Sequence, residues 1–260
     1  NSNRFRSLLA ENPELADNPR YASVPHLIDK GYSFGIKPLP PTTTTSFLPA
    51  NRTKTKKEDD ALRANAKRLV AQNKAYGPFV LHLVESVVGP IQSSPMHPIP
   101  KAPLPEEPER WRMIEDFSSP YDSRGVSSSL AVNFEVNPKD FPANYKKWRD
   151  VSSFLRGLPS HAIVFTVDFL DGFEHLDLDP AVRPRLAFTV DEDVYIRSCA
   201  PFGLVAIPGE FSTSVELTLE GVNRHFKGKV VAISHMDDCS FAILDPSITM
   251  EDVIKVIESF

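Results

Sequence analysis

The feature that most constrains the fold is a pair of short apolar runs separated by a small polar segment. The runs, Val230 to Ser234 and Ser240 to Leu244, are rich in residues that favour β-strands, and His235 to Asp238 lies between them. This pattern predicts a β-hairpin with two adjacent aspartates at its tip. Neighbouring aspartates repel, and a fold keeps them together mainly where a cation neutralises them. Aspartate is also common in turns, so a purely structural polar turn is the alternative interpretation.

Another carboxylate follows an apolar run earlier in the chain. Ile163 to Val167 predicts a buried strand that ends at Asp168 and continues through Phe173 into a short helix. A strand-end aspartate beside a hairpin aspartate pair gives three carboxylates that could hold two Mg²⁺ ions. Paired metal ions clamp the attacking and leaving oxygens of a phosphoryl transfer. Between the two acidic segments, Ala200 to Phe211 predicts a turn followed by a helix.

Composition sets broad limits on the class of protein. The 260 residues are 41% hydrophobic, enough for one large or two small globular units. No apolar run approaches the roughly 20 residues of a membrane span, and no signal-peptide pattern opens the chain. Two cysteines are too few for a disulfide framework, which favours a reducing compartment in the cytoplasm or nucleus over secretion.

The charge is uneven along the chain although the net charge is −5. Residues 1–157 carry 22 basic and 17 acidic side chains, and residues 158–260 carry 7 and 17. The acidic part contains the proposed metal site, and the basic part is where nucleic acid or a triphosphate would be bound. Two ordinary solvated surfaces are the alternative.

Three blocks in order resemble motifs A, B and C of a reverse transcriptase palm. They are Asp168 to Phe173, Pro201 to Phe211 and His235 to Asp238. The Pro-Phe-Gly-Leu form of the second block is similar to long-terminal-repeat (gypsy-type) and tyrosine-recombinase (DIRS-like) retroelements. The run Arg110 to Phe117 resembles the Trp-Arg strand of the reverse transcriptase fingers. The resemblance covers roughly residues 78–244.

The resemblance implies an α+β right-hand polymerase fold with fingers and palm but without a thumb. The palm would be a ferredoxin-like βαββαβ sheet with helices on one face. The implied division is an N-terminal helical lead-in at residues 1–77, fingers at 78–160 and a palm at 161–260. Because the chain ends about 22 residues after motif C, we expect a fragment or truncated copy of a retroelement polymerase.

The resemblance also implies residue roles. Asp168, Asp237 and Asp238 would be the catalytic carboxylates and, with the backbone carbonyl of Phe169, the ligands of two Mg²⁺ or Mn²⁺ ions. The residues implied to contact the incoming dNTP are Lys101, Arg112, Phe173, Phe202 and Gly203. Phe173 would be the steric gate that rejects a ribose 2′-OH. His235 and Met236 would contact the primer end.

The implied activity is RNA-directed DNA polymerisation, a nucleotidyl transfer. Its partners would be an RNA or DNA template with primer, together with dNTPs, and no membrane. Two other classes stay open: a weakly active or inactive polymerase-like module that binds RNA or a protein, and a metal-dependent phosphohydrolase or cyclase on a related palm. The intact carboxylates favour an enzyme, and Pro201 to Gly203 with the Trp111-Arg112 strand favours a polymerase.

Three residues depart from the pattern of the family. His235 stands where tyrosine is usual and could titrate near neutral pH. Glu174 follows the gate, where an apolar residue is usual, and adds negative charge near the site. Gly172 replaces the commoner alanine. Arg112 also has an alternative role, an ion pair on its own strand with Glu115 or Asp116.

Helical periodicity gives further expectations. Short helices are expected in residues 1–50, and longer ones at Glu58 to Tyr76, Lys146 to Leu158 and Glu210 to His225, with a last helix capped by Thr249. The side chains expected to face the core from the third helix are Trp148, Val151, Phe154 and Leu155. Those expected to face the sheet from the last helix are Met250, Val253, Ile254 and Ile257.

Overall fold

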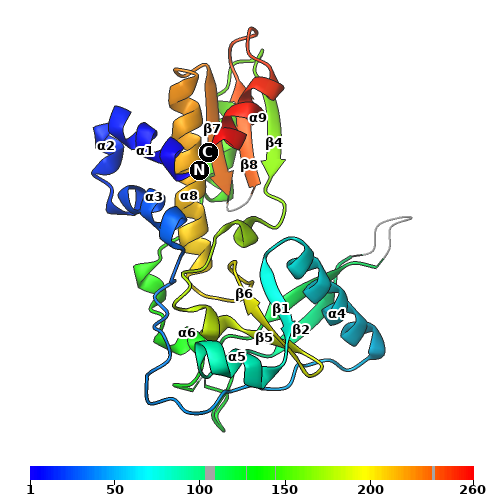
Figure 1. The fold of residues 1–260 in the computed structure, drawn as a ribbon. Helices are drawn as coiled ribbons and strands as arrows, with labels where there is room; N and C mark the ends of the chain where they lie inside the picture. The colour runs from blue at the N-terminus through cyan, green and yellow to red at the C-terminus, as the bar shows by residue number, and fades with distance from the viewer. Residues whose placement is uncertain (103–108, 127, 144, 236–237) are drawn as a thin grey trace. The chain divides into compact units, whose positions relative to one another are not determined.

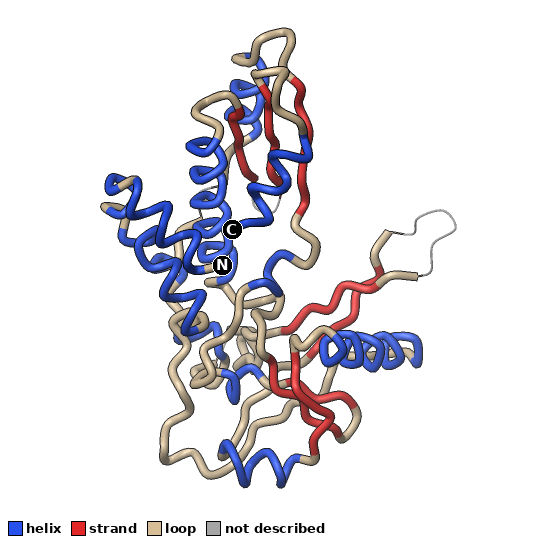
Figure 2. Tube along the Cα trace, turned by 45° about the horizontal axis from the view of Figure 1, so that its top comes forward, coloured by secondary structure: helices blue, strands red, loops and turns tan. Residues whose placement is uncertain are grey.

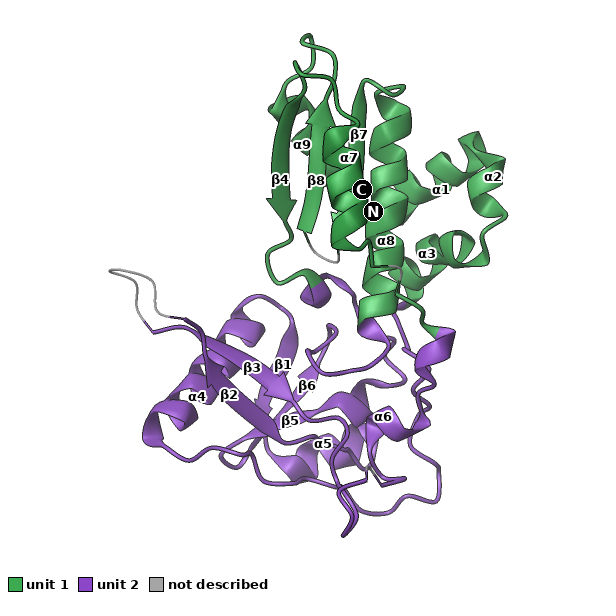
Figure 3. Ribbon diagram, turned by 180° about the vertical axis from the view of Figure 1, so that it is seen from behind, with its two compact units in different colours: residues 1–30, 141–172, 208–260 green, residues 31–140, 173–207 purple. Residues whose placement is uncertain are grey.

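The computed structural model describes residues 1–102, 109–126, 128–143, 145–235 and 238–260. The chain divides into two compact units (Figure 3). Unit 1 contains residues 1–30, 141–172 and 208–260, and unit 2 contains residues 31–140 and 173–207. The predicted division into polymerase subdomains, with boundaries at residues 77 and 160, stays a prediction.

Unit 1 is built around a three-stranded antiparallel sheet in the order β4-β8-β7 (Figure 1). Its strands are β4 (Ile163–Asp168), β7 (Val230–His235) and β8 (Asp238–Ile243). The β7–β8 pairing confirms the predicted hairpin. The prediction that β4 is buried was wrong: Ile163 is 52% exposed and Val164 is 44% exposed. An apolar run indicates a strand but not its place in the sheet, and β4 is an edge strand with a neighbour on one side only.

Unit 1 contains six helices among the described residues, of which α8 is the longest. They are α8 (Ile207–His225), α7 (Trp148–Arg156), α9 (Met250–Ser259), α1 (Ser2–Glu11), α2 (Pro13–Ala16) and α3 (Pro19–Lys30). The helix predicted at Glu210 to His225 forms as α8, and Phe211, Val215, Leu219 and Val222, which lie at helical spacing, are buried. The α1–α3 group lies against α8 (Figure 1), with Phe5 and Leu217 in one apolar cluster.

Two helices of unit 1 differ from the sequence prediction. In α7, Trp148 is 79% exposed and Leu155 is 43% exposed, so the expectation that this stripe belongs to the core was wrong. In α9, the predicted Thr249 cap forms with Asp252, and Val253 is buried, but Met250 is half exposed. Figures 1 and 3, viewed from opposite sides, show α9 and α7 on opposite faces of the sheet.

From β4 onward, the helices and strands among the described residues of unit 1 follow the order β4-α8-β7-β8-α9. A sixth element that would complete the expected βαββαβ order is not formed in that part of the chain.

Unit 2 contains a three-stranded sheet and a two-stranded ribbon, both visible in Figure 2. The sheet has the order β1-β6-β5, from β1 (Ala75–Phe79), β5 (Phe188–Val190) and β6 (Asp193–Arg197). The ribbon pairs β2 (Met96–Pro100) with β3 (Trp111–Glu115). The helices are α4 (Lys56–Ala71), α5 (Leu81–Val88) and α6 (Val132–Glu135), with 3₁₀ turns at Pro138–Asp140, Gly172–His175 and Arg183–Leu186.

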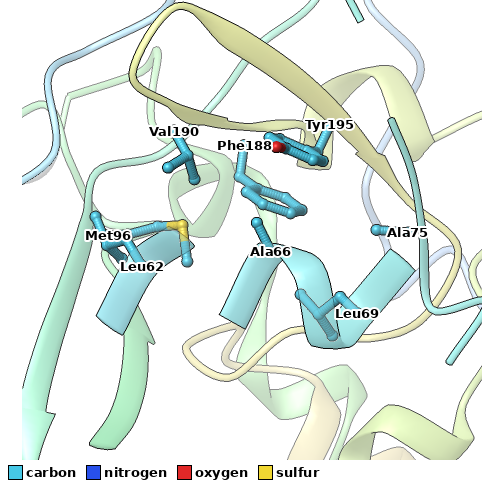
Figure 4. Close-up of a cluster of buried hydrophobic side chains, with 8 residues drawn as sticks. All are labelled: Leu62, Ala66, Leu69, Ala75, Met96, Phe188, Val190 and Tyr195. Carbon is cyan, nitrogen blue, oxygen red and sulfur yellow. The ribbon is translucent and has the colours of Figure 1, made fainter. Parts of the chain in front are cut away.

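The core of unit 2 is formed by α4 against both strand groups (Figure 4). Leu62, Ala66 and Leu69 project from α4 onto Met96 and Phe188. The helix ends five residues earlier than expected, at Ala71 instead of Tyr76, because the chain turns at Asn73, with φ of 58°, and enters β1. Tyr76 therefore lies in a strand and not in a helix.

Two other sequence expectations concern cysteines and membranes. Cys199 and Cys239 are both buried, as small apolar side chains usually are. In the described part of the chain, no helix combines the length and apolar character needed to cross a membrane.

Candidate functional site

Two of the predicted aspartates lie directly opposite each other at one end of the unit 1 sheet. Asp168, the last residue of β4, is the direct partner of Asp238, the first residue of β8. Asp238 is in turn the direct partner of His235, the last residue of β7. Direct partners on antiparallel strands project to the same face of the sheet. Asp168, Asp238 and His235 therefore form a row across one end of the sheet, and all three are exposed.

The row puts two negative charges opposite each other without a protein cation. In the described part of the chain, neither Asp168 nor Asp238 forms an ion pair. Like charges directly opposite each other on a sheet are destabilising. The described residues contain no group of three His, Cys, Asp or Glu side chains placed to hold a metal ion. Met236 and Asp237, which were predicted to contribute, lie outside the described residues.

The segment after Asp168 is fixed by packing against α8. The ring of Phe169 meets the edge of the Phe211 ring, with centroids 5.9 Å apart. The Gly172 amide donates a hydrogen bond to the Phe169 carbonyl at 3.1 Å, and that carbonyl retains a second lone pair. A Cβ on Gly172 would lie 2.8 Å from the Phe211 ring. Glycine in place of the usual alanine is therefore a packing requirement of this chain.

His235 is held by the segment that precedes α7. Its Nδ1 lies 2.7 Å from the carbonyl oxygen of Lys146, and its ring centroid lies 5.9 Å from that of Tyr145. A carbonyl oxygen only accepts hydrogen bonds, so Nδ1 carries a proton and donates it. The other ring nitrogen, Nε2, is then the one left for a ligand.

The two predicted basic contacts lie on the β2–β3 ribbon of unit 2. Arg112 pairs with Ile99, and the Lys101 amide continues the ladder by donating to the Arg110 carbonyl at 2.8 Å. Residues two apart on a strand share a face, so Lys101 and Arg112 project to the same side of the ribbon. Both are exposed.

The alternative role for Arg112 is not observed, because its candidate carboxylates have other partners. Glu115 forms a buried ion pair with Arg197. Asp116 pairs with Arg52 at 2.7 Å. Arg112 therefore keeps its guanidinium at the surface, where it could contact an anion.

Phe173, Phe202 and Gly203 are brought together within unit 2. The rings of Phe173 and Phe202 have centroids 4.8 Å apart. Gly203 has φ of 118°, and a Cβ there would overlap the carbonyl oxygen of Glu115. Only glycine fits this turn.

Asn133, which the sequence analysis did not single out, holds that turn in place. Its side-chain amide donates to the Gly203 carbonyl at 3.0 Å, and its Oδ1 accepts from the Val205 amide at 3.1 Å. Nothing in the local sequence indicates this role, because the partners lie about 70 residues apart in the chain.

Glu174 was expected to add negative charge near the site, but its carboxylate is paired with two cations. Its carboxylate accepts hydrogen bonds from both terminal nitrogens of Arg68, at 2.7 and 3.0 Å, and from Lys74 Nζ at 2.8 Å. Burial alone would raise the pKa of Glu174, but the hydrogen bonds from Arg68 and Lys74 outweigh burial and lower it. Glu174, next to the predicted gate, is thus an ionised carboxylate that links Arg68 of α4 to Lys74, the residue before β1.

The predicted residues therefore fall into two local groups. Asp168, Phe169, His235 and Asp238 lie together in unit 1. The group in unit 2 is Lys101 with Arg112 on the ribbon, and Phe173 with Phe202 and Gly203 at the turn.

Comparison with known proteins finds similarity in sequence to a transposon polyprotein and in structure to a viral reverse transcriptase. The chain is 25% identical over 159 residues to a "Retrovirus-related Pol polyprotein from transposon opus" of Drosophila melanogaster, covering 60% of this chain and 14% of that protein. The native crystal structure of the prototype foamy virus protease–reverse transcriptase superposes with a TM-score of 0.55 at 17% identity. The selenomethionine-labelled CSH mutant of that protein gives 0.53 at 17% identity. Each match covers 86% of this chain and 25% of the foamy virus chain.

No protein-family model matches the chain. The fold is a mixed α/β fold similar to that of a viral reverse transcriptase. In sequence the chain is similar to part of the transposon Pol polyprotein, of which it spans about one seventh. The DIRS-like or gypsy-type subtype stays a prediction.

Proposed function

We propose that this chain is the core of an RNA-directed DNA polymerase that extends a primer with dNTPs. The observation that carries the proposal is the direct register between Asp168 and Asp238 at the exposed end of the unit 1 sheet. Opposed carboxylates with no protein cation are costly to a fold and useful to a two-metal nucleotidyl transfer. The similarity to a retroelement Pol polyprotein supports the same reaction class.

Metal binding in this proposal belongs to Asp168, Asp238 and Asp237, with the backbone carbonyl of Phe169. Oxygen donors from carboxylates and carbonyls are the ligands that Mg²⁺ and Mn²⁺ prefer. When bound, two such ions would lower the pKa of a primer 3′-hydroxyl and neutralise charge on the leaving pyrophosphate. No side chain of this protein has to act as a general base.

The chain's own residues would bind and select the nucleotide. Lys101 and Arg112 share one face of the ribbon, and an arginine fork pairs with phosphate oxygens. The Phe173 ring, supported by Phe202, would exclude a 2′-hydroxyl, and Gly203 would let the turn approach a nascent base pair. His235 and Met236 would contact the primer end. Such a polymerase would work in the cytoplasm or nucleus of its host, on an RNA or DNA template with primer.

The test is extension of a DNA primer on an RNA template with dNTPs, in Mg²⁺ and separately in Mn²⁺. Wild type should extend, and Asp168→Asn, Asp238→Asn and Asp237→Ala should each reduce extension by several orders of magnitude. Asp17→Asn removes one exposed carboxylate elsewhere in unit 1 and serves as the charge-matched control.

Phe173→Ala tests the nucleotide selection in the same assay. It should raise ribonucleotide incorporation relative to dNTP incorporation. Unchanged extension in all three carboxylate variants would exclude two-metal catalysis at this site. Metal-dependent hydrolysis of nucleotides without extension would move the chain to the phosphohydrolase or cyclase class.

A further inference from the structure

A basic and aromatic run precedes and begins α7. Tyr145-Lys146-Lys147-Trp148-Arg149 carries three cations and two aromatic rings in five residues, and all five are exposed. Trp148 is 79% exposed, and the Arg149 side chain is 81% exposed. An indole that is four-fifths exposed adds little to the stability of the core, so packing does not explain this residue.

The run lies beside the acidic row. The Lys146 carbonyl accepts the hydrogen bond from His235, the residue opposite Asp238. A cavity of about 290 Å³ has Lys146, Trp148 and Val151 on one side. Its other walls are the two strands of the hairpin, at Ile233, Ser234, His235, Asp238 and Ser240. Its volume is close to the smallest ligand pockets, and a single nucleobase or nucleotide is of that size.

The charges of the run contrast with their surroundings. Residues 158–260 carry 7 basic and 17 acidic side chains, so a polyanion approaching the carboxylates meets repulsion from most of this sequence. Lys146, Lys147 and Arg149 supply positive charge in the segment hydrogen-bonded to His235. Exposed aromatic rings interleaved with cations are the components of single-stranded nucleic-acid grooves, where bases stack and phosphates are neutralised.

We propose that Tyr145 to Arg149 is a grip for a single nucleic-acid strand whose end lies at the Asp168–Asp238 row. Trp148 stacks on a base near that end, and Lys146, Lys147 and Arg149 contact the phosphates that follow. A second copy of this chain fits less well, because the patch is cationic as well as apolar. The proposal deepens the proposed polymerase function and rests on it for the identity of the strand, which would be the primer.

The first test is binding of a labelled single-stranded oligonucleotide and of a primer–template, measured by fluorescence anisotropy in EDTA. Metal-dependent chemistry cannot contribute under these conditions. Trp148→Ala should weaken binding roughly 5- to 150-fold, the cost of one lost base–aromatic stack. Trp148→Phe retains a ring and should recover part of that loss. Because Trp148 is exposed, both variants should melt like wild type.

Stacking also has a direct spectroscopic signature. The chain has two tryptophans, Trp111 and Trp148. In a Trp111→Phe background, quenching of the remaining indole by the oligonucleotide reports on Trp148 alone. Quenching should saturate together with the anisotropy change.

The second test separates these cations from general charge. The triple variant Lys146→Gln/Lys147→Gln/Arg149→Gln should reduce the slope of log K against log salt by about 2, at roughly 0.7 for each single-strand phosphate contact. The matched control is Arg156→Gln/Lys227→Gln/Lys255→Gln, which removes the same charge from exposed positions elsewhere in unit 1. It should change the slope by much less.

Equal affinity in wild type and Trp148→Ala, or equal slopes in the two triple variants, would overturn the grip. So would a Trp148-dependent change in sedimentation mass without an effect on oligonucleotide affinity, because the patch would then join two copies of the chain. These outcomes are distinct from failure of the polymerase proposal. Trp148-dependent binding without primer extension keeps the grip and removes the catalysis, and the reverse result removes the grip alone.

Discussion

The opposed carboxylates predict that a mutation that abolishes function should also stabilise the metal-free protein. Asp238→Asn keeps the size and strand position of the side chain but removes one of the two charges in the Asp168–Asp238 pair. Cross-strand pairs of this kind change stability by roughly 0.2–1 kcal/mol, and both side chains are exposed, so the gain should not exceed about 1 kcal/mol. For a chain of this size that is at most about 3 °C in Tm.

A divalent cation should reverse the order of stability. A ligand that binds only the folded state stabilises it by RT ln(1 + [L]/Kd), which is about 1.4 kcal/mol at ten times the dissociation constant. Wild type should gain this stability as Mg²⁺ or Mn²⁺ is added, whereas Asp238→Asn should gain much less. Thermal melts in EDTA and across a metal titration, followed by circular dichroism, measure both effects.

The double variant provides the sharpest control on this reasoning. Once one carboxylate is neutral, removing the other relieves no further repulsion, so Asp168→Asn/Asp238→Asn should be no more stable in EDTA than either single variant. Asp17→Asn should show neither the gain in EDTA nor the loss of metal response. If Asp238→Asn melts below wild type in EDTA, the two charges do not repel in the folded state and the reasoning fails.

Three further predictions concern unit 2, each read from urea denaturation. Glu174→Gln should cost roughly 1.5–3 kcal/mol at pH 7, because its two cationic partners lose their carboxylate. Since the folded-state pKa of Glu174 is lowered, its contribution is complete above about pH 4.5 and declines as the pH falls towards the folded-state pKa, so wild type and variant should converge in acid. Gly203→Ala should cost roughly 1–3 kcal/mol, because of its positive φ and the overlap with Glu115, whereas Gly157→Ala should be nearly neutral. Leu69→Ala should cost about 2–5 kcal/mol, since Leu69 is fully buried against the core.

The hairpin strands could be predicted because their signals are local. Two short apolar runs that are rich in strand-favouring residues identify β7 and β8. The α8 helix could be predicted for the same reason, since Phe211, Val215, Leu219 and Val222 repeat at helical spacing and are buried. These signals extend over fewer than about 20 residues of sequence.

The errors concern what lies against an element, which local pattern does not encode. Trp148 and Leu155 form an apolar stripe on α7, yet both are largely exposed, because the stripe identifies a face of the helix and not the surface that covers it. Glu174 is bound by Arg68 and Lys74, which lie 106 and 100 residues away in the sequence. No spacing rule connects residues at that separation, so an isolated acidic residue at this position looked unpaired.

The position of the carboxylate row follows from the core of unit 1. On β8, Cys239, Phe241 and Ile243 alternate onto a buried face, where Phe241 stacks on Phe165 at a centroid distance of 5.3 Å. A slip of one residue would move this set to the opposite face of the sheet and turn Asp238 to the face where Phe165 and Phe241 stack. The buried face thus fixes the register, and the register places Asp238 opposite Asp168 at the end of the sheet. The apolar packing supplies the stability that an unfavourable pair of charges removes. The same alternation on β8 therefore forms the core and places the carboxylates of the candidate site opposite each other.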